Sequence, residues 1–219
     1  VIAPKPGYLN RIEELCNKHG ALFYLDETVT GFRVAAVGCA ELYGLKPDIV
    51  TYGKALGGGV PMAAIGGSHE IMSGLEWGKV LHFGTHNAGR LALHICKTML
   101  TTMLEDNQAG FVKIKDLGIK LTEEIQSISR KNTKHKMVCQ GVNSMFQIFF
   151  TDQKEISNYR DFCRSVDRVK FRDFALKLFD KGIYMNPSAT LHSLSSIIHN
   201  EKDIEVTARA IAETLDEMP

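Results

Sequence analysis

Apolar residues in the first half of the chain alternate between helical spacing and short continuous runs. Helical spacing over residues 9–16, followed by Gly20, predicts a helix with a glycine at its C-terminus. Residues 21–25 form an almost wholly apolar run, which is typical of a strand buried on both faces. Further strands are predicted at 49–52 and 62–65, and short helices near 38–43 and 70. This alternation favours an α/β fold with a mostly parallel sheet.

The pattern of elements changes near residue 107. Residues 1–107 carry the α/β pattern, and residues 108–219 have the helices and strands of a smaller α+β domain. Asn200 and Asp203 are placed as a capping pair at the start of the last helix. The predicted elements are helices at 91–104, 111–129, 171–179 and 201–215, and strands at 137–139, 145–150 and 183–185.

Composition narrows the class of protein without naming a function. The chain has 219 residues, 44% of them hydrophobic, and a formal net charge of +1. A balance so close to neutral gives no reason to expect nucleic acid or an anionic membrane as a partner. The five cysteines are scattered and never spaced as C-x-x-C, which favours a reducing compartment, so we expect a cytoplasmic protein. No apolar run approaches the roughly 20 residues of a membrane span.

An acid and a lysine mark the ends of two predicted strands. Asp26 follows the first apolar run, and Lys54 follows the run at 49–52 in a glycine-rich loop. Ligands of open α/β sheets gather outside the carboxyl ends of the strands, so both side chains are expected at that edge. The acid could bind a metal, a ribose hydroxyl or a protonated ring nitrogen, and the lysine could bind phosphate or form an imine. A capping aspartate and a solvated lysine would give the same spacing.

Two longer stretches around these residues resemble a known family. Residues 24–33 (YLDETVTGFR) and 47–61 (PDIVTYGKALGGGVP) closely resemble the class III aminotransferases, which are fold-type I enzymes dependent on pyridoxal 5′-phosphate (PLP). The triple glycine and the later Pro187-Ser188-Ala189 look most like the glutamate-1-semialdehyde 2,1-aminomutase branch. The resemblance implies that residues 1–107 are the C-terminal part of the PLP-binding large domain, and that a preceding N-terminal part is missing from this chain.

The resemblance also implies a role for each matching residue. Lys54 would form the Schiff base with PLP and then carry protons, and Asp26 would pair with the pyridine nitrogen. Gly84 and Thr85 would contact the cofactor phosphate across a dimer interface. The expected partners are therefore a small-molecule amino substrate and a second copy of the chain, with the cofactor site at the interface.

Two positions next to Asp26 depart from the family pattern. Thr28 stands where the family usually has a valine packed on the cofactor ring. Val29 stands where many transaminases have a glutamine that bonds the phenolic oxygen of PLP, and valine cannot make that bond. Both residues are still expected to line the cofactor. Leu191 stands where the aminomutase branch often has a glutamate, which indicates a changed substrate pocket.

The expected function is movement of an amino group on an amino acid or amino aldehyde, similar to that of the aminomutases. Alternatives are a class III aminotransferase with another substrate, or a catalytically silent homologue that serves as a binding or assembly module. No metal site is expected, because His82 and His86 lie in a predicted loop without an obvious third ligand. Trp77 is expected to be a packing or dimer-contact residue.

Overall fold

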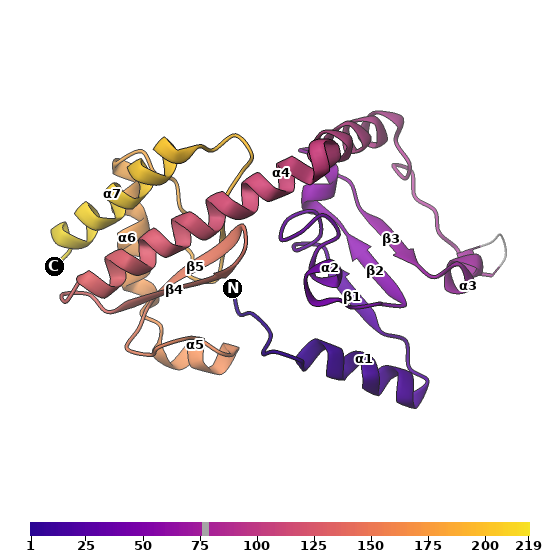
Figure 1. Cartoon of the computed structure of the whole chain (residues 1–219), viewed down its shortest axis with the longest axis horizontal. Helices are drawn as coiled ribbons and strands as arrows, with labels where there is room; N and C mark the ends of the chain where they lie inside the picture. The colour runs from indigo at the N-terminus through magenta and orange to yellow at the C-terminus, as the bar shows by residue number, and fades with distance from the viewer. Residues whose placement is uncertain (76–78) are drawn as a thin grey trace. The chain divides into compact units, whose positions relative to one another are not determined.

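The chain divides into two compact units in the computed structural model, which describes residues 1–75 and 79–219 (Figure 1). The N-terminal unit is Pro4–Phe111, and the C-terminal unit is Val112–Pro219 together with Val1–Ala3. The boundary expected at residue 107 falls in a stretch of non-helical backbone, Glu105–Gln108. The expected role of Trp77 lies outside the described residues.

The N-terminal unit builds a small sheet flanked by short helices. Its first helix ends where the sequence predicts, at Gly20, whose left-handed backbone lets its N–H reach the carbonyl of Asn17. The elements of this unit before residue 90 are α1 (Tyr8–His19), β1 (Tyr24–Glu27), α2 (Cys39–Tyr43), β2 (Ile49–Tyr52), η1 (Lys54–Gly57), β3 (Ala64–Gly67), α3 (His69–Met72) and η2 (Ser73–Leu75), and the first part of α4 follows.

The sheet is only partly parallel, with the strand order β1-β2-β3 (Figure 1). Strands β1 and β2 run parallel, and Asp26 is paired with Thr51. Strands β2 and β3 run antiparallel, so the prediction of a mostly parallel sheet holds for one of the two pairings. The connection from Tyr52 to Ala64 contains only the 3-10 turn η1, whereas a parallel return usually needs an α-helix as its crossover.

The predicted burial of the first strand is wrong in this chain. Strand β1 begins at Tyr24 rather than at residue 21, and the Tyr24 and Asp26 side chains are exposed. Among the described residues β1 pairs with β2 alone, so one of its edges has no neighbouring strand. An apolar run indicates that a strand forms, but burial also depends on which elements cover it.

The C-terminal unit contains a second sheet, with the strand order β4-β5-β6. Strand β5 forms at the predicted residues, and the last helix has the predicted capping box of Asn200 and Asp203. The elements from residue 90 onward are α4 (Arg90–Lys131), β4 (Met137–Val142), β5 (Met145–Phe150), α5 (Tyr159–Ser165), α6 (Arg168–Asp180), β6 (Ser193–Leu194) and α7 (Glu201–Glu217). Among the described helices, none combines the length and the apolar character that a bilayer crossing requires.

One apolar core holds the C-terminal unit together. All six residues of β5 are buried, and α6 contacts both β5 and α7 (Figure 1). Phe174 of α6 is fully buried and meets Phe150 edge-on, with ring centroids 5.3 Å apart. Helix α4 contributes Leu117, Leu121 and Ile125 to this core, and α7 contributes Ile204, Ile211 and Leu215.

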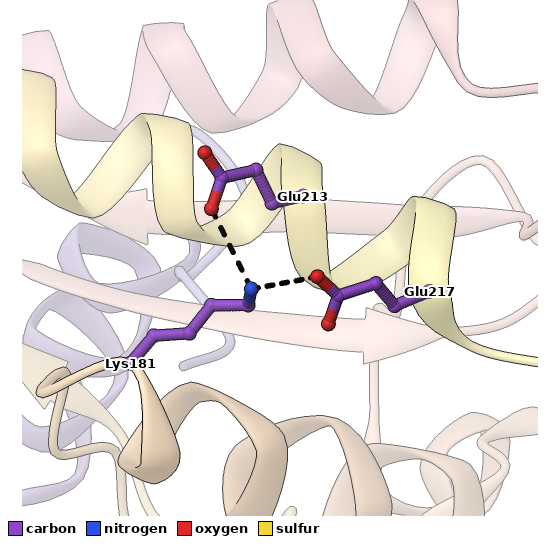
Figure 2. Close-up of polar contacts among 3 residues, drawn as sticks. All are labelled: Lys181, Glu213 and Glu217. Carbon is purple, nitrogen blue, oxygen red and sulfur yellow. Dashed lines mark hydrogen bonds and ion pairs between the residues drawn. The ribbon is translucent and has the colours of Figure 1, made fainter.

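An ion-pair cluster joins the end of α6 to α7. The Lys181 ammonium lies 2.8 Å from a carboxylate oxygen of Glu217 and 3.5 Å from one of Glu213, as Figure 2 shows. The carboxylate of Glu217 raises the pKa of Lys181, and the hydrogen bond from Lys181 lowers the pKa of Glu217. Both acids are more than half exposed, so this cluster contributes little compared with the aromatic core.

The strand predicted at 183–185 does not form. The third strand of the second sheet is β6, whose Ser193 and Leu194 pair with Phe146 and Met145. Met185 is nevertheless buried. The segment 183–185 is therefore packed against the core without pairing as a strand. An apolar run of three residues predicts burial but does not tell these two arrangements apart.

His135 is a buried histidine with no hydrogen bond to either ring nitrogen among the described residues. Burial, and then the charge of Lys170, lowers the pKa of His135, while the nearby carbonyls of Met218 and Leu215 oppose this. The folded state therefore binds a proton less readily than the unfolded chain, where histidine titrates near about 6.5. We expect the free energy of unfolding to fall as the pH drops below about 6.5 towards the lowered pKa of the folded state.

Urea unfolding at about pH 7.5 and about pH 5 measures this dependence. A His135→Gln variant should lose part of the difference in stability between the two pH values, because glutamine takes up no proton. His19→Gln changes an exposed histidine and should keep the whole difference. Equal pH dependence in His135→Gln and the unaltered chain would contradict the assignment.

Candidate functional site

Asp26 lies near the end of β1 with its side chain on an exposed face of the sheet. Its Oδ1 accepts hydrogen bonds from the Thr28 backbone N–H at 2.9 Å, from the Thr28 hydroxyl, and from the Thr51 hydroxyl at 3.1 Å. The hydroxyls of Tyr24 and Thr51 are 2.8 Å apart, so they extend the network along the same face. Among the described residues, none donates a hydrogen bond to Oδ2.

These donors favour the ionised form of Asp26. The hydrogen bonds from Thr28, first its hydroxyl and then its backbone N–H, hold the pKa of Asp26 below its ordinary value. The Thr51 hydroxyl and the positive charge of Lys54 act in the same direction. The site therefore presents a carboxylate at neutral pH with one oxygen open to a positively charged group.

Lys54 follows β2 by two residues and starts the turn η1. Because β1 and β2 are parallel, their carboxyl ends bring Asp26 and Lys54 to the same sheet edge, as the sequence predicts. Lys54 has a left-handed backbone, with φ of 45°, which is uncommon for a side chain with a Cβ and costs on the order of 1–3 kcal/mol. Its amine is exposed and has no ion pair within 4 Å among the described residues.

The donor set suits a cofactor that carries a cationic ring nitrogen and an aldehyde. The open Oδ2 of Asp26 can accept a hydrogen bond from the ring nitrogen, and the unpaired amine of Lys54 can bond to the aldehyde carbon. The residues present therefore fit pyridoxal phosphate, the cofactor that the sequence resemblance implies.

Thr28 and Val29 lie directly after β1, and both are half-buried. The hydroxyl of Thr28 bonds to Asp26, which the sequence did not reveal. Its methyl group faces Gly53, because a Cβ added to Gly53 would lie 3.2 Å from the Thr28 Cγ2. Thr28 therefore contacts Asp26 and the residue before Lys54, whereas the role expected for Val29 stays a prediction.

Gly84 and Thr85 lie in an exposed turn before α4. The carbonyl of Gly84 accepts a hydrogen bond from the Asn87 N–H at 3.0 Å, which closes the turn. No described contact joins either residue to Asp26 or Lys54 within the chain, so their role in binding phosphate stays a prediction. In the described part of the chain, no three histidine, cysteine or acidic residues are grouped closely enough to hold a metal ion.

Glu27 belongs to the framework of the site, although the sequence pattern did not predict it. It is fully buried on the other side of β1, where its carboxyl group accepts hydrogen bonds from the Ala40 N–H at 2.7 Å and from the Thr30 hydroxyl. Burial and the nearby Glu27 raise the pKa of Cys39. The sequence feature that could have identified Glu27 is a second acid directly after Asp26 at the end of the apolar run. The contacts of Glu27 fasten the loop that connects β1 to α2.

A cavity of about 430 Å³ lies in the C-terminal unit, away from Asp26 and Lys54 in the sequence. His199 and Asp203 line it, but both already serve the start of α7. His199 Nδ1 accepts the Ser196 N–H, and Asp203 accepts the Asn200 N–H. His199 and Asp203 are therefore engaged in local hydrogen bonds, unlike the open Oδ2 of Asp26 and the amine of Lys54.

Comparison with known proteins places the whole chain in one family. The sequence model of "Aminotransferase class-III" matches residues 1–215. A glutamate-1-semialdehyde 2,1-aminomutase of Alkaliphilus oremlandii (strain OhILAs) is 38% identical over 219 residues, which are 100% of this chain and 50% of that protein.

Solved structures agree with the fold. An omega-transaminase from Sphaerobacter thermophilus matches 97% of this chain and 48% of its own, with a TM-score of 0.88 and 25% identity. A transaminase solved with PLP bound matches 99% of this chain and 49% of its own, with a TM-score of 0.82 and 24% identity, and it supports the fold alone. The chain spans about half the length of the curated aminomutases that it matches. From the family match over nearly its full length, the chain belongs to the class III aminotransferase family.

Proposed function

We propose that this chain acts in a PLP-dependent enzyme that moves an amino group on an amino acid or amino aldehyde, as a glutamate-1-semialdehyde aminomutase does. One observation carries the proposal: the open oxygen of Asp26 and the unpaired amine of Lys54 lie at the same edge of the first sheet. Family membership and 38% identity to an aminomutase support it.

Each residue has a task that follows from its chemistry. PLP, when bound, supplies a conjugated ring that draws electrons from the substrate Cα. Asp26 holds the ring nitrogen through Oδ2, and its negative charge favours the protonated nitrogen. Lys54 holds the cofactor through Nζ and, once a substrate amine has taken its place, its free amine moves a proton to and from the substrate Cα.

A transaminase with a different substrate is the second candidate. The likeness to an omega-transaminase at a TM-score of 0.88 favours it. Val29 points the other way, because its side chain has no amide to bond the phenolic oxygen of the cofactor. The two reactions differ in one requirement that assays can test, since a transaminase needs a second keto acid and a mutase does not.

A homodimer in the cytoplasm is part of the proposal. Gly84 and Thr85 are exposed, and the apolar side chains of Leu81, Phe83 and Leu91 around them are at least 70% exposed within the single chain. Apolar side chains gathered in this way are typical of surfaces that another protein covers. Gly84 and Thr85 could then reach the cofactor phosphate of the partner subunit.

Reduction with borohydride after addition of PLP tests the proposed function. We expect the purified chain to develop an absorbance band near the visible edge, and borohydride to remove the band and fix the cofactor on Lys54, as peptide mapping would reveal. If borohydride instead fixed the cofactor on many lysines in proportion to their exposure, with no preference for Lys54, the result would contradict the proposal and support a catalytically silent binding module.

A further inference from the structure

Thr28 contacts Asp26 and Gly53, the residue before Lys54, through different atoms. Its Oγ1 donates to Asp26 Oδ1, and its Cγ2 faces the Cα of Gly53, the residue before Lys54. The side chain is half-buried and lies one residue beyond β1. A single side chain therefore lies between Asp26 and the backbone that leads to Lys54.

The hydrogen bonds to Asp26 are unevenly divided between its two oxygens. Oδ1 receives three donors, which are the Thr28 hydroxyl, the Thr28 N–H and the Thr51 hydroxyl. A carboxylate oxygen offers about two lone-pair directions, so Oδ1 has no capacity left for a ligand. A ligand must approach the other oxygen, Oδ2, and the donors on Oδ1 hold the carboxylate in one orientation.

A simple turn would not need this arrangement. The hydrogen bond from the Thr28 N–H to Asp26 is by itself sufficient to form a local turn after a strand. The Thr28 hydroxyl and the Thr51 hydroxyl add two donors from two different strand ends. The second of these comes from β2, 25 residues along the chain, so the orientation of Asp26 is also held across the sheet.

We infer that Thr28 is a positioning residue, which turns Oδ2 of Asp26 towards the ligand through its hydroxyl and supports the Gly53–Lys54 backbone through its methyl group. The inference rests on the proposed function, and it assigns Thr28 a task other than lining the cofactor ring. Thr51 assists through the second hydroxyl. The hydroxyl and the methyl group have separate effects, so two conservative variants can tell them apart.

The titration of Asp26 in the cofactor-free chain tests the inference directly. Carbon-13 labelling of the aspartate carboxyl groups reports each titration, and Asp26→Asn identifies the Asp26 signal. Thr28→Val keeps the shape and loses the hydroxyl, so the pKa of Asp26 should rise towards its ordinary value. Thr28→Ser keeps the hydroxyl, so the pKa should stay low while the Lys54 amide exchanges faster with solvent.

Cofactor binding provides a second measurement. Thr28→Val should weaken PLP binding roughly tenfold, because one hydrogen bond to a charged group is lost. Thr30→Val is the matched control, since its hydroxyl bonds to Glu27 and its loss should leave the Asp26 titration in place. If Thr28→Val fails to fold, Thr51→Val removes the other hydroxyl and should also raise the pKa of Asp26.

Some outcomes would overturn the inference while leaving the proposed function intact. One is a pKa of Asp26 that is unchanged in Thr28→Val or, should that variant not fold, in Thr51→Val. Another is a pKa of Asp26 that rises as far in Thr28→Ser as in Thr28→Val. In contrast, an unaltered chain that never binds PLP at Lys54 would defeat the proposed function, whatever the titration of Asp26.

Discussion

Replacing Lys54 by alanine should abolish covalent attachment of PLP and lower the rate of amino-group transfer by roughly a thousandfold or more. General acid–base catalysis by a positioned side chain contributes about 10²–10⁴ in rate, and Lys54 also forms the bond that holds the cofactor. Single-turnover assays with PLP present, together with borohydride trapping, measure both losses.

Two variants separate this effect from a general loss of positive charge. Lys54→Arg keeps the charge but cannot form the covalent bond, so it should be as impaired as Lys54→Ala. Lys46→Ala removes an exposed lysine of the same unit and should retain full activity. A Lys54→Ala variant that retains turnover would refute the catalytic assignment.

Replacing Phe174 by alanine should destabilise the C-terminal unit by about 3–5 kcal/mol, the usual cost of removing a buried aromatic ring. Phe174 is fully buried, and its ring contacts the rings of Phe150 and Phe171, so the variant loses apolar contacts and leaves a cavity. Denaturant unfolding followed by circular dichroism measures the change in the free energy of unfolding.

The same helix provides the control for this experiment. Phe179 of α6 is 62% exposed, so Phe179→Ala removes an equal ring with little loss of burial. Phe174→Leu keeps most of the buried volume and should fall between the two alanine variants. Similar unfolding midpoints for Phe174→Ala and Phe179→Ala would show that the aromatic core does not determine the stability of the unit.

The placement of Asp26 and Lys54 could be predicted because it depends on local sequence patterns. Each of Asp26 and Lys54 follows or ends an apolar run, and parallel strands place their carboxyl ends together. The framework around them could not be predicted in the same way. The hydrogen bond from Thr51 to Asp26 depends on the register between β1 and β2, and the burial of Glu27 depends on the position of α2.

Errors in the predicted fold have the same origin. The antiparallel pairing of β3 and the choice of β6 as the neighbour of β5 are both decided by contacts between distant segments. Apolar spacing reports that a segment is buried or extended, but it does not identify the strand that pairs with it. Helix α5, which begins with the cap Asn158 and is only 7 residues long, was too short for its spacing to stand out.

The sequence alone predicted the end of α1 at Gly20, the capped start of α7, the strands at 49–52 and 145–150, and the placement of Asp26 and Lys54 at one sheet edge. Caps, glycines with positive φ and apolar runs act over a few residues, so they can be read along the chain. Tertiary contacts established the strand partners, the burial of Glu27 and His135, and the contacts of Thr28 with Asp26 and Gly53. These features arise between segments that meet only after folding, where packing and hydrogen-bond geometry select one arrangement.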